Sequence, residues 1–199
     1  MRVALFGGTF DPPHRGHISI AAAAADAFRL DSVLFAPVGH QPLKPGGTSA
    51  SFADRLAMTS LACNEDERFQ ASSLDSPRPN GLPNYTVDTL AELQRTMPDA
   101  MLFNLVGADS FLDLPRWRQP DRLLELAEWI VVSRPGFSLD DLSSLHLSAH
   151  RRARVHLLQS VHEDVSATNL RQRLHTGDLC ADLLPVAVSN YIQAHRLYR

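Results

Sequence analysis

Short apolar runs alternate with stretches of apolar residues at helical spacing along the whole chain. The apolar runs predict strands at residues 3–6, 33–37, 68–72, 101–106, 129–133 and 154–158. The helical spacing predicts helices at residues 16–29, 52–64, 87–97, 122–128, 169–176 and 186–194. Such alternation favours an α/β fold, a doubly wound and mostly parallel sheet with helices on both of its faces.

Local signals sharpen the predicted boundaries of three helices. Ser51, followed three residues later by Asp54, resembles a capping box at the start of the second helix. Ser166 is a predicted N-cap for the helix at residues 169–176, and Thr86 for the third helix. Behind it, Val87, Leu90, Leu93 and Met97 repeat at helical spacing and are predicted core residues.

Composition limits the class of protein. The chain has 199 residues, of which 44% are hydrophobic and 21% charged, so we expect one globular domain over residues 1–199. A net charge of −3 does not favour a nucleic-acid partner. No apolar run approaches the about 20 residues that span a bilayer, and no signal peptide is expected. Cys63 and Cys180 form no Cys-x-x-Cys pair, which is typical of reduced thiols in a cytoplasmic protein.

The most informative stretch is residues 3–17, where an apolar strand turns through Gly7 and Gly8 toward a helix. Unpaired N–H groups and the helix dipole make such a junction an anion site. His14 and His17 lie at its mouth, and Thr9 adds a hydroxyl donor. Glycines alone would indicate only a turn. Two histidines at this spacing also suit a metal, but no Cys, Glu or third His lies nearby in sequence, so we expect no protein metal ligand.

Residues 7–17, Gly-Gly-Thr-Phe-Asp-Pro-Pro-His-Arg-Gly-His, resemble the signature of the nucleotidylyltransferase superfamily, with its His-x-Gly-His motif. The opening Gly-Gly-Thr-Phe-Asp-Pro resembles that of the bacterial nicotinate-mononucleotide adenylyltransferases. The resemblance extends over nearly the whole chain and implies a single Rossmann-like nucleotidylyltransferase domain. By fold analogy we expect strand order 3-2-1-4-5, which would place the loop at residues 107–110 beside the signature.

The resemblance implies adenylyl transfer from ATP to nicotinate mononucleotide, giving deamido-NAD and pyrophosphate. It assigns catalysis to His17, at the α-phosphate, and to His14, at the neighbouring phosphates. Further residues are predicted to bind ATP through backbone atoms, hydroxyls or charge: Gly8, Thr9, Phe10, Lys44, Gly107, Asp109, Arg134, Ser166, Thr168 and Arg171. Lys44 is the chain's single lysine, beside 18 arginines.

A second set is predicted to bind the mononucleotide: Tyr85, Thr86, Asp109 and Trp117. The N-terminus of the third helix suits a carboxylate, Asp109 suits ribose hydroxyls, and Trp117 offers a flat face to a pyridinium ring. Thr86 can also simply cap its helix, and a tryptophan is more often core. Arg116 and Arg118 flank Trp117, however, which argues against its deep burial.

The sequence departs from the family pattern at Gln41, Leu43 and Ala167. Mg²⁺ is expected to arrive with ATP, because it prefers phosphates and water to an all-protein cage. The expected partners are thus ATP and nicotinate mononucleotide, with neither nucleic acid nor membrane, and with homo-oligomerisation left open.

Three alternatives stay open at this point. An adenylyltransferase acting on nicotinamide mononucleotide or phosphopantetheine would share the signature. A nucleotide-binding regulator without turnover is disfavoured by the presence of His14, His17, Lys44 and Arg171. A dehydrogenase is disfavoured because Gly-x-Gly-x-x-Gly does not follow the first strand.

Overall fold

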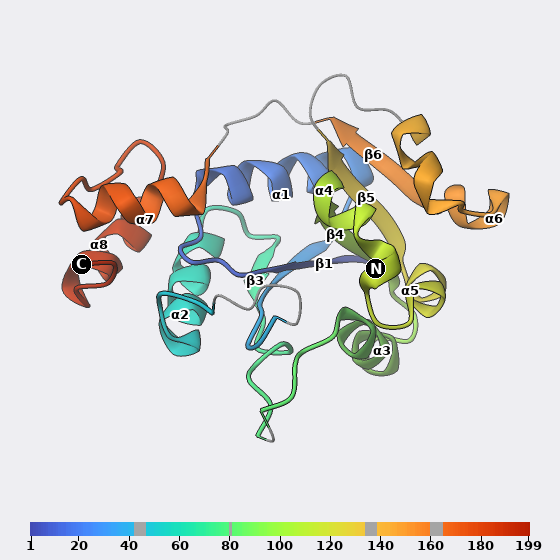
Figure 1. The fold of residues 1–199 in the computed structure, drawn as a ribbon, viewed down its shortest axis with the longest axis horizontal. Coiled ribbons are helices and arrows are strands. Elements are labelled where there is room, and N and C mark those ends of the chain that lie inside the picture. The colour runs from blue at the N-terminus through green and yellow to red at the C-terminus, as the bar shows by residue number, and fades with distance from the viewer. Residues whose placement is uncertain (42–46, 80, 134–138, 160–164) are drawn as a thin grey trace. The chain divides into compact units, whose positions relative to one another are not determined.

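The computed structural model describes residues 1–41, 47–79, 81–133, 139–159 and 165–199 (Figure 1). Its strands are β1 Arg2–Gly8, β2 Ser32–Pro37, β3 Phe69–Ala71, β4 Met101–Gly107, β5 Glu128–Ser133 and β6 Val155–Gln159. Its α-helices are α1 Arg15–Phe28, α2 Phe52–Cys63, α3 Thr86–Thr96, α4 Ala108–Leu112, α5 Pro120–Leu126, α6 Ala149–Arg152, α7 Ala167–His175 and α8 Val186–Ala194. Two 3₁₀ helices are η1 Leu114–Arg116 and η2 Leu139–Leu145.

The six strands form one sheet in the order β3-β2-β1-β4-β5-β6. The pairs β1/β4, β4/β5 and β5/β6 are all parallel. The predicted α/β fold and the expected order 3-2-1-4-5 are therefore confirmed, with β6 added beyond β5. The order reverses between β1 and β4, the kind of point at which α/β sheets bind ligands.

The chain divides into two compact units. The first unit comprises Met1–Gly7, Ile20–Leu34 and Tyr85–His162, and the second comprises Gly8–Ser19, Phe35–Asn84 and Glu163–Arg199. Each unit is built from segments that are distant in sequence, so neither is a simple N- or C-terminal half. A single functional domain over residues 1–199 stays a prediction.

Helices cover both faces of the sheet in the first unit, as predicted. On one face, the Phe28 ring at the end of α1 packs against Phe103 of β4, with ring centroids 6.3 Å apart. On the other, Trp129 of β5 packs against Phe111 of α4 at 5.1 Å and donates its indole N–H to the Leu123 carbonyl of α5 at 3.3 Å. Trp129 is fully buried, so its large apolar area contributes strongly to this core.

The core of the second unit is formed by α2, α7 and α8, whose apolar faces include Met58, Leu170 and Val188. Two predicted N-caps organise these helices. The Ser51 hydroxyl accepts the Asp54 N–H at 3.1 Å and donates to the Asp54 carboxylate at 2.6 Å. The Ser166 hydroxyl accepts the Asn169 N–H at 3.4 Å at the start of α7. Both caps are confirmed.

Two local predictions are wrong. Thr86 is the first residue of α3 rather than its N-cap, which is Tyr85, and Tyr85 caps with an extended backbone and no side-chain hydrogen bond. Residues 108–112 form α4 rather than a loop. A helix of five residues is too short to show a helical period in the sequence, so this one could not be read from spacing.

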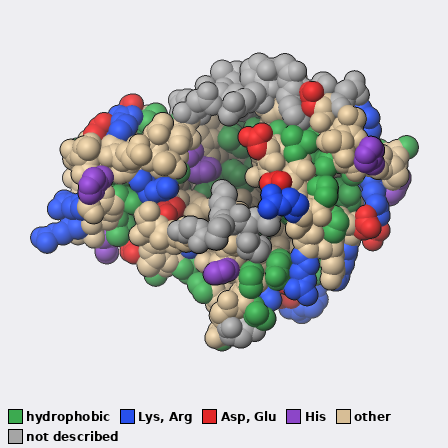
Figure 2. Space-filling view, in the orientation of Figure 1, with side chains coloured by type: hydrophobic (Ala, Val, Ile, Leu, Met, Phe, Trp, Pro, Cys, Tyr) green, Lys and Arg blue, Asp and Glu red, His purple; other side chains and the backbone are tan. Residues whose placement is uncertain are grey.

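On the face drawn in Figure 2, Arg side chains are interspersed with Asp and Glu side chains. Among the described residues, no helix has both the length and the apolar character that crossing a membrane requires.

Candidate active site

A stacked pair of imidazoles lies where β1 leads into α1. The rings of His14 and His17 are 3.6 Å apart between centroids and inclined by 25°. The His14 backbone N–H donates to Nδ1 of His17 at 3.2 Å. Because Nδ1 is an acceptor, a neutral His17 carries its proton on Nε2, which makes that atom a hydrogen-bond donor. We call residues 8–17, which hold both histidines, the signature loop.

Burial keeps both imidazoles uncharged at neutral pH. It lowers the pKa of His14 from 6.5 to about 4. Burial and, secondly, the adjacent His14 lower the pKa of His17 well below 6.5. Nδ1 of His14 is buried and has no hydrogen-bond partner among the described residues. A buried imidazolium lacks the water that would stabilise its charge. An anion bound beside the two rings would therefore raise their pKa again.

The ring of Phe10 packs against the ring of His17. Its ring is 2% exposed and meets the His17 ring edge-on at 5.0 Å and Phe35 at 5.6 Å. The backbone of Phe10 is left-handed, with φ 48°. Gly8 is needed beneath it, because a Cβ there would lie 2.9 Å from Cζ of Phe10. The prediction for Phe10 concerned backbone contacts, whereas its ring proves to be packed against a predicted catalytic residue.

Arg55 of α2 was missed by sequence reasoning. It is 1% exposed, and its guanidinium donates to the carbonyls of Thr9 at 2.7 Å and Val38 at 2.8 Å. Its position on the apolar side of α2, one turn before Met58, was a signal that could have identified a buried arginine. Gln41, a departure from the family pattern, lies with its Oε1 3.3 Å from the Thr9 hydroxyl. Both residues fix the start of the signature loop.

The N-terminal part of α7 also reaches this loop. Arg171 donates from Nη1 to the Asp11 carbonyl at 2.9 Å and from Nη2 to the Thr168 hydroxyl at 3.4 Å. Ser166 caps the same helix. The second unit therefore brings Thr168 and Arg171 together with the signature loop, as the resemblance implies. The cationic Arg171 has a fixed position there that suits phosphate oxygens.

The first unit contains the residues predicted for the mononucleotide. Tyr85 and Thr86 lie at the start of α3, where the first N–H groups of the helix lack intrahelical partners. Trp117 is half-buried, as its charged neighbours indicated. Its ring meets the Trp129 ring edge-on, with the ring centroids 5.9 Å apart. Arg118, which sequence reasoning did not select, places its guanidinium 4.6 Å from the Tyr85 ring centroid. That contact brings the Trp117 segment to the start of α3.

Gly107 and Asp109 lie at the carboxyl end of β4 in the same unit. Gly107 is the N-cap of α4, and Asp109 is exposed in its first turn. Lys44 and Arg134 lie outside the described residues, as does Leu43. Among the residues that are described, no three His, Cys, Asp or Glu side chains are grouped as metal ligands.

A family model described as cytidylyltransferase-like matches residues 5–173. The chain belongs to the cytidylyltransferase-like family. The match extends from β1 into α7 and so includes the signature loop, Arg171 and every residue predicted for the mononucleotide.

Relatives place the chain in one branch of the cytidylyltransferase-like family. It is 41% identical to a protein of Synechococcus sp. (strain JA-3-3Ab), over 99% of this chain and 94% of that one. It is 43% identical to a protein of Roseiflexus sp. (strain RS-1), over 99% and 98% of the two chains. Both carry the name probable nicotinate-nucleotide adenylyltransferase. The predicted resemblance to nicotinate-mononucleotide adenylyltransferases is confirmed.

The fold of this family member is also found in solved structures. A Plasmodium falciparum nicotinic acid mononucleotide adenylyltransferase complexed with NaAD matches with a TM-score of 0.73 at 14% identity. The match covers 99% of this chain and 97% of the other. The complex of the same enzyme with APC matches with a TM-score of 0.72. At this identity the likeness establishes the Rossmann-like α/β fold.

Proposed function

We propose that this chain transfers the adenylyl group of ATP to nicotinate mononucleotide, releasing pyrophosphate and forming deamido-NAD. The observation that carries the proposal is the stacked His14–His17 pair, in which Nδ1 of His17 accepts a backbone N–H and leaves Nε2 as a donor. Relatives at 41% and 43% identity that carry the adenylyltransferase name support the choice of reaction.

The chemistry requires positioned charge rather than a general base. A phosphate oxygen of the mononucleotide attacks the α-phosphorus of ATP in line, the bond to the β-phosphate oxygen breaks, and pyrophosphate leaves with that electron pair. The attacking phosphate monoester is already mostly dianionic at pH 7, since its second pKa is about 6. Negative charge grows on the α-phosphate oxygens, and a donor already in place there lowers the barrier.

In this proposal His17 donates from Nε2 to the α-phosphate, and His14 binds the phosphates beside it. Arg171, Lys44 and the hydroxyls of Ser166 and Thr168 bind the leaving pyrophosphate. ATP is the magnesium complex, so Mg²⁺ enters as part of the substrate. The remaining ATP contacts are assigned to the backbone of Gly8, Thr9 and Phe10 and to Gly107, Asp109 and Arg134.

The mononucleotide is assigned to the residues of the first unit. The N–H groups at Tyr85 and Thr86 pair with the nicotinate carboxylate, and Asp109 accepts ribose hydroxyls. Trp117, only half-buried, stacks on the pyridinium ring. N–H donors that pair with a carboxylate match an amide badly, which favours the acid over nicotinamide mononucleotide. We further propose that residues 1–199 act as one domain in the cytoplasm.

The deciding experiment measures pyrophosphate release with MgATP and four acceptors offered separately: nicotinate mononucleotide, nicotinamide mononucleotide, phosphopantetheine and flavin mononucleotide. Release with the nicotinate form alone supports both the reaction and the carboxylate site. Release with another acceptor retains adenylyl transfer but refutes the roles given to Thr86 and Trp117. ATP binding without release for any acceptor would favour a regulator instead.

A further inference from the structure

Asp11 belongs to the signature loop, and its carboxylate accepts three hydrogen bonds from the residues that the structure describes. Asp11 is 4% exposed. The backbone N–H groups of Ser49 and Ala50 donate to it at 2.7 and 3.1 Å. The third donor is the Tyr198 hydroxyl, 2.7 Å from Oδ1 and 187 residues away in sequence. A phenol is thus held against the loop by a short bond to a buried charged group, the stronger class of hydrogen bond.

Two residues that precede Tyr198 in the chain, Arg171 and Leu183, also contact the signature loop. Arg171 donates to the Asp11 carbonyl at 2.9 Å. The Leu183 carbonyl accepts the N–H of Arg15 at 2.9 Å, at the first residue of α1 between the two histidines. Residues 165–199, the C-terminal segment, therefore hold the loop at Asp11 and again beside His14 and His17.

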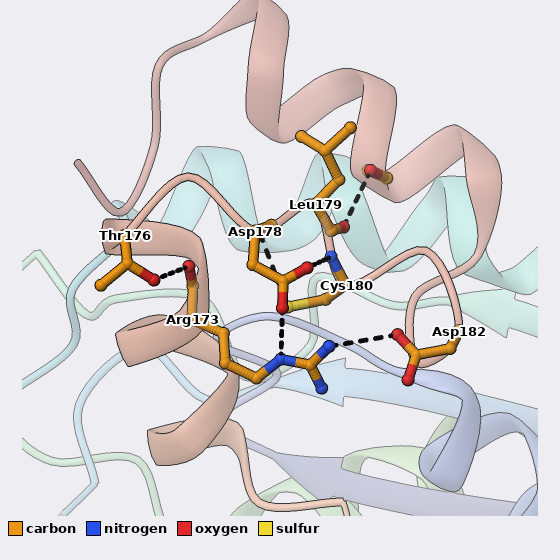
Figure 3. Close-up of polar contacts among 7 residues, drawn as sticks. Arg173, Thr176, Asp178, Leu179, Cys180 and Asp182 are labelled. Atoms are coloured by element: carbon orange, nitrogen blue, oxygen red, sulfur yellow. Dashed lines mark hydrogen bonds and ion pairs between the residues drawn. The ribbon is translucent and has the colours of Figure 1, made fainter.

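Polar contacts fix the segment between α7 and α8, which precedes Tyr198 in the chain (Figure 3). Arg173 donates from Nε to the Asp178 carboxylate at 2.7 Å, and the same carboxylate accepts the Cys180 N–H at 2.9 Å. The Ser189 hydroxyl of α8 donates to the Leu179 carbonyl at 3.3 Å. After α8, the Leu197 N–H returns to the Ile192 carbonyl at 3.0 Å. Hydrogen bonds therefore fix the chain from α7 to the residue before Tyr198.

We infer that Tyr198 is a positioning residue for ATP. Its hydroxyl holds Asp11, and through Asp11 it keeps the loop that carries His14 and His17 in the conformation that receives the triphosphate. This role rests on the proposed function, since it concerns the ATP half of that reaction. Burial and the bond to Asp11 both raise the pKa of the Tyr198 hydroxyl, so it remains protonated and continues to donate at every pH of interest.

The test is Tyr198→Phe, with Tyr191→Phe as the matched control. Tyr191 makes the same kind of bond in the same unit, from its hydroxyl to the Asp54 carboxylate at 3.0 Å. Calorimetric titration with MgATP alone should show Kd raised about tenfold in Tyr198→Phe, the effect of losing a hydrogen bond to a charged group. Tyr191→Phe should stay within about twofold of wild type. The KM for nicotinate mononucleotide should be unchanged in both variants.

Equal ATP affinity in wild type and both variants overturns the inference. So does an equal loss of affinity for both substrates accompanied by a lower Tm, because that pattern indicates stability alone. A double-mutant cycle adds a second criterion: Asp11→Asn and Tyr198→Phe together should weaken ATP binding less than the sum of the single effects, and additivity overturns the inference.

The titration needs no turnover, so its outcome is separate from that of the proposed function. Failure of the wild-type protein to release pyrophosphate refutes the reaction and leaves the ATP affinities to decide the role of Tyr198. A wild-type protein that binds no ATP refutes both.

Discussion

Replacing Gly8 by alanine should damage the site through one added methyl group. An ideal Cβ at Gly8 lies 2.9 Å from Cζ of Phe10 and 3.1 and 3.2 Å from the two adjacent ring carbons. The ring has little room to retreat, because it is 2% exposed and packed between His17 and Phe35. The displaced ring pushes on His17, so both stability and turnover should fall.

The size of the stability loss follows from two opposing effects. Overpacking a filled core costs about 1–3 kcal/mol. Exchanging glycine for alanine recovers about 0.4–1 kcal/mol by restricting the unfolded chain. Taken at the middle of each range, the net loss in the free energy of unfolding is therefore about 1–2 kcal/mol. For a chain of 199 residues this lowers Tm by about 2–8 °C.

The neighbouring glycine supplies the control for this measurement. A Cβ at Gly7 would meet nothing within 4 Å, so Gly7→Ala should be neutral or stabilise by about 0.4–1 kcal/mol. Urea unfolding of both variants, with kcat measured for Gly8→Ala, gives the comparison. Adding Phe10→Leu to Gly8→Ala should recover part of the lost stability, because the shorter side chain vacates the position that the new methyl group occupies.

Two results would refute this reasoning. One is a Gly8→Ala protein as stable as Gly7→Ala, which would mean that the Phe10 ring moves without cost. The other is strict additivity of Gly8→Ala and Phe10→Leu, which would mean that the methyl group and the ring do not collide.

Three other predictions concern the same loop. His17→Ala should lower kcat by about 10²–10³ in a protein that still folds, and near-normal turnover in that folded variant would exclude His17 as the donor to the α-phosphate. His14 titrates at 6.5 when unfolded and about 4 when folded, so the unfolded state binds more protons between these values and stability should fall as pH drops from 6.5 to 4. That loss amounts to about 3 kcal/mol, and urea unfolding at several pH values should show a flatter dependence in His14→Gln. Arg55→Met should destabilise by about 2–4 kcal/mol, since two carbonyls lose their buried donor, and an unchanged urea midpoint would contradict that role.

The elements that sequence reasoning predicted well have strong local signals. The buried strand β5 contains the continuous apolar run 129–132, and β4 contains an apolar run that is interrupted by Asn104. Val87, Leu90 and Leu93 are buried where the helical period of α3 places them. Ser51 and Ser166 cap their helices because a hydroxyl one residue before a helix can satisfy its free N–H groups. Met97, at the end of the same period, is only half-buried, since α3 ends before it.

The missed residues Asp11 and Tyr198 act through a contact that has no local signature. Tyr198 and Asp11 are separated by 187 residues, and nothing near either one announces the other. Thr86 was assigned as a cap because its residue type suits one, yet the residue that caps α3 is Tyr85, which does so through its backbone alone. A cap made by the main chain leaves no trace in residue type, which is why this boundary was displaced by one residue.

The buried contacts of the signature loop explain why residues that touch no phosphate should affect ATP affinity. The left-handed backbone at Phe10 is strained by about 1–3 kcal/mol and persists only if its surroundings enforce it. Each residue that ATP had to order on binding would cost about 1–2 kcal/mol, so a mobile loop would lose several kcal/mol of affinity. Arg55 holds the Thr9 carbonyl, and the N–H groups of Ser49 and Ala50 hold Asp11, before any ligand arrives. Because the loop is already ordered when the protein folds, ATP binding does not have to order it. The interactions of ATP with the loop can then stabilise the charge that develops on the α-phosphate.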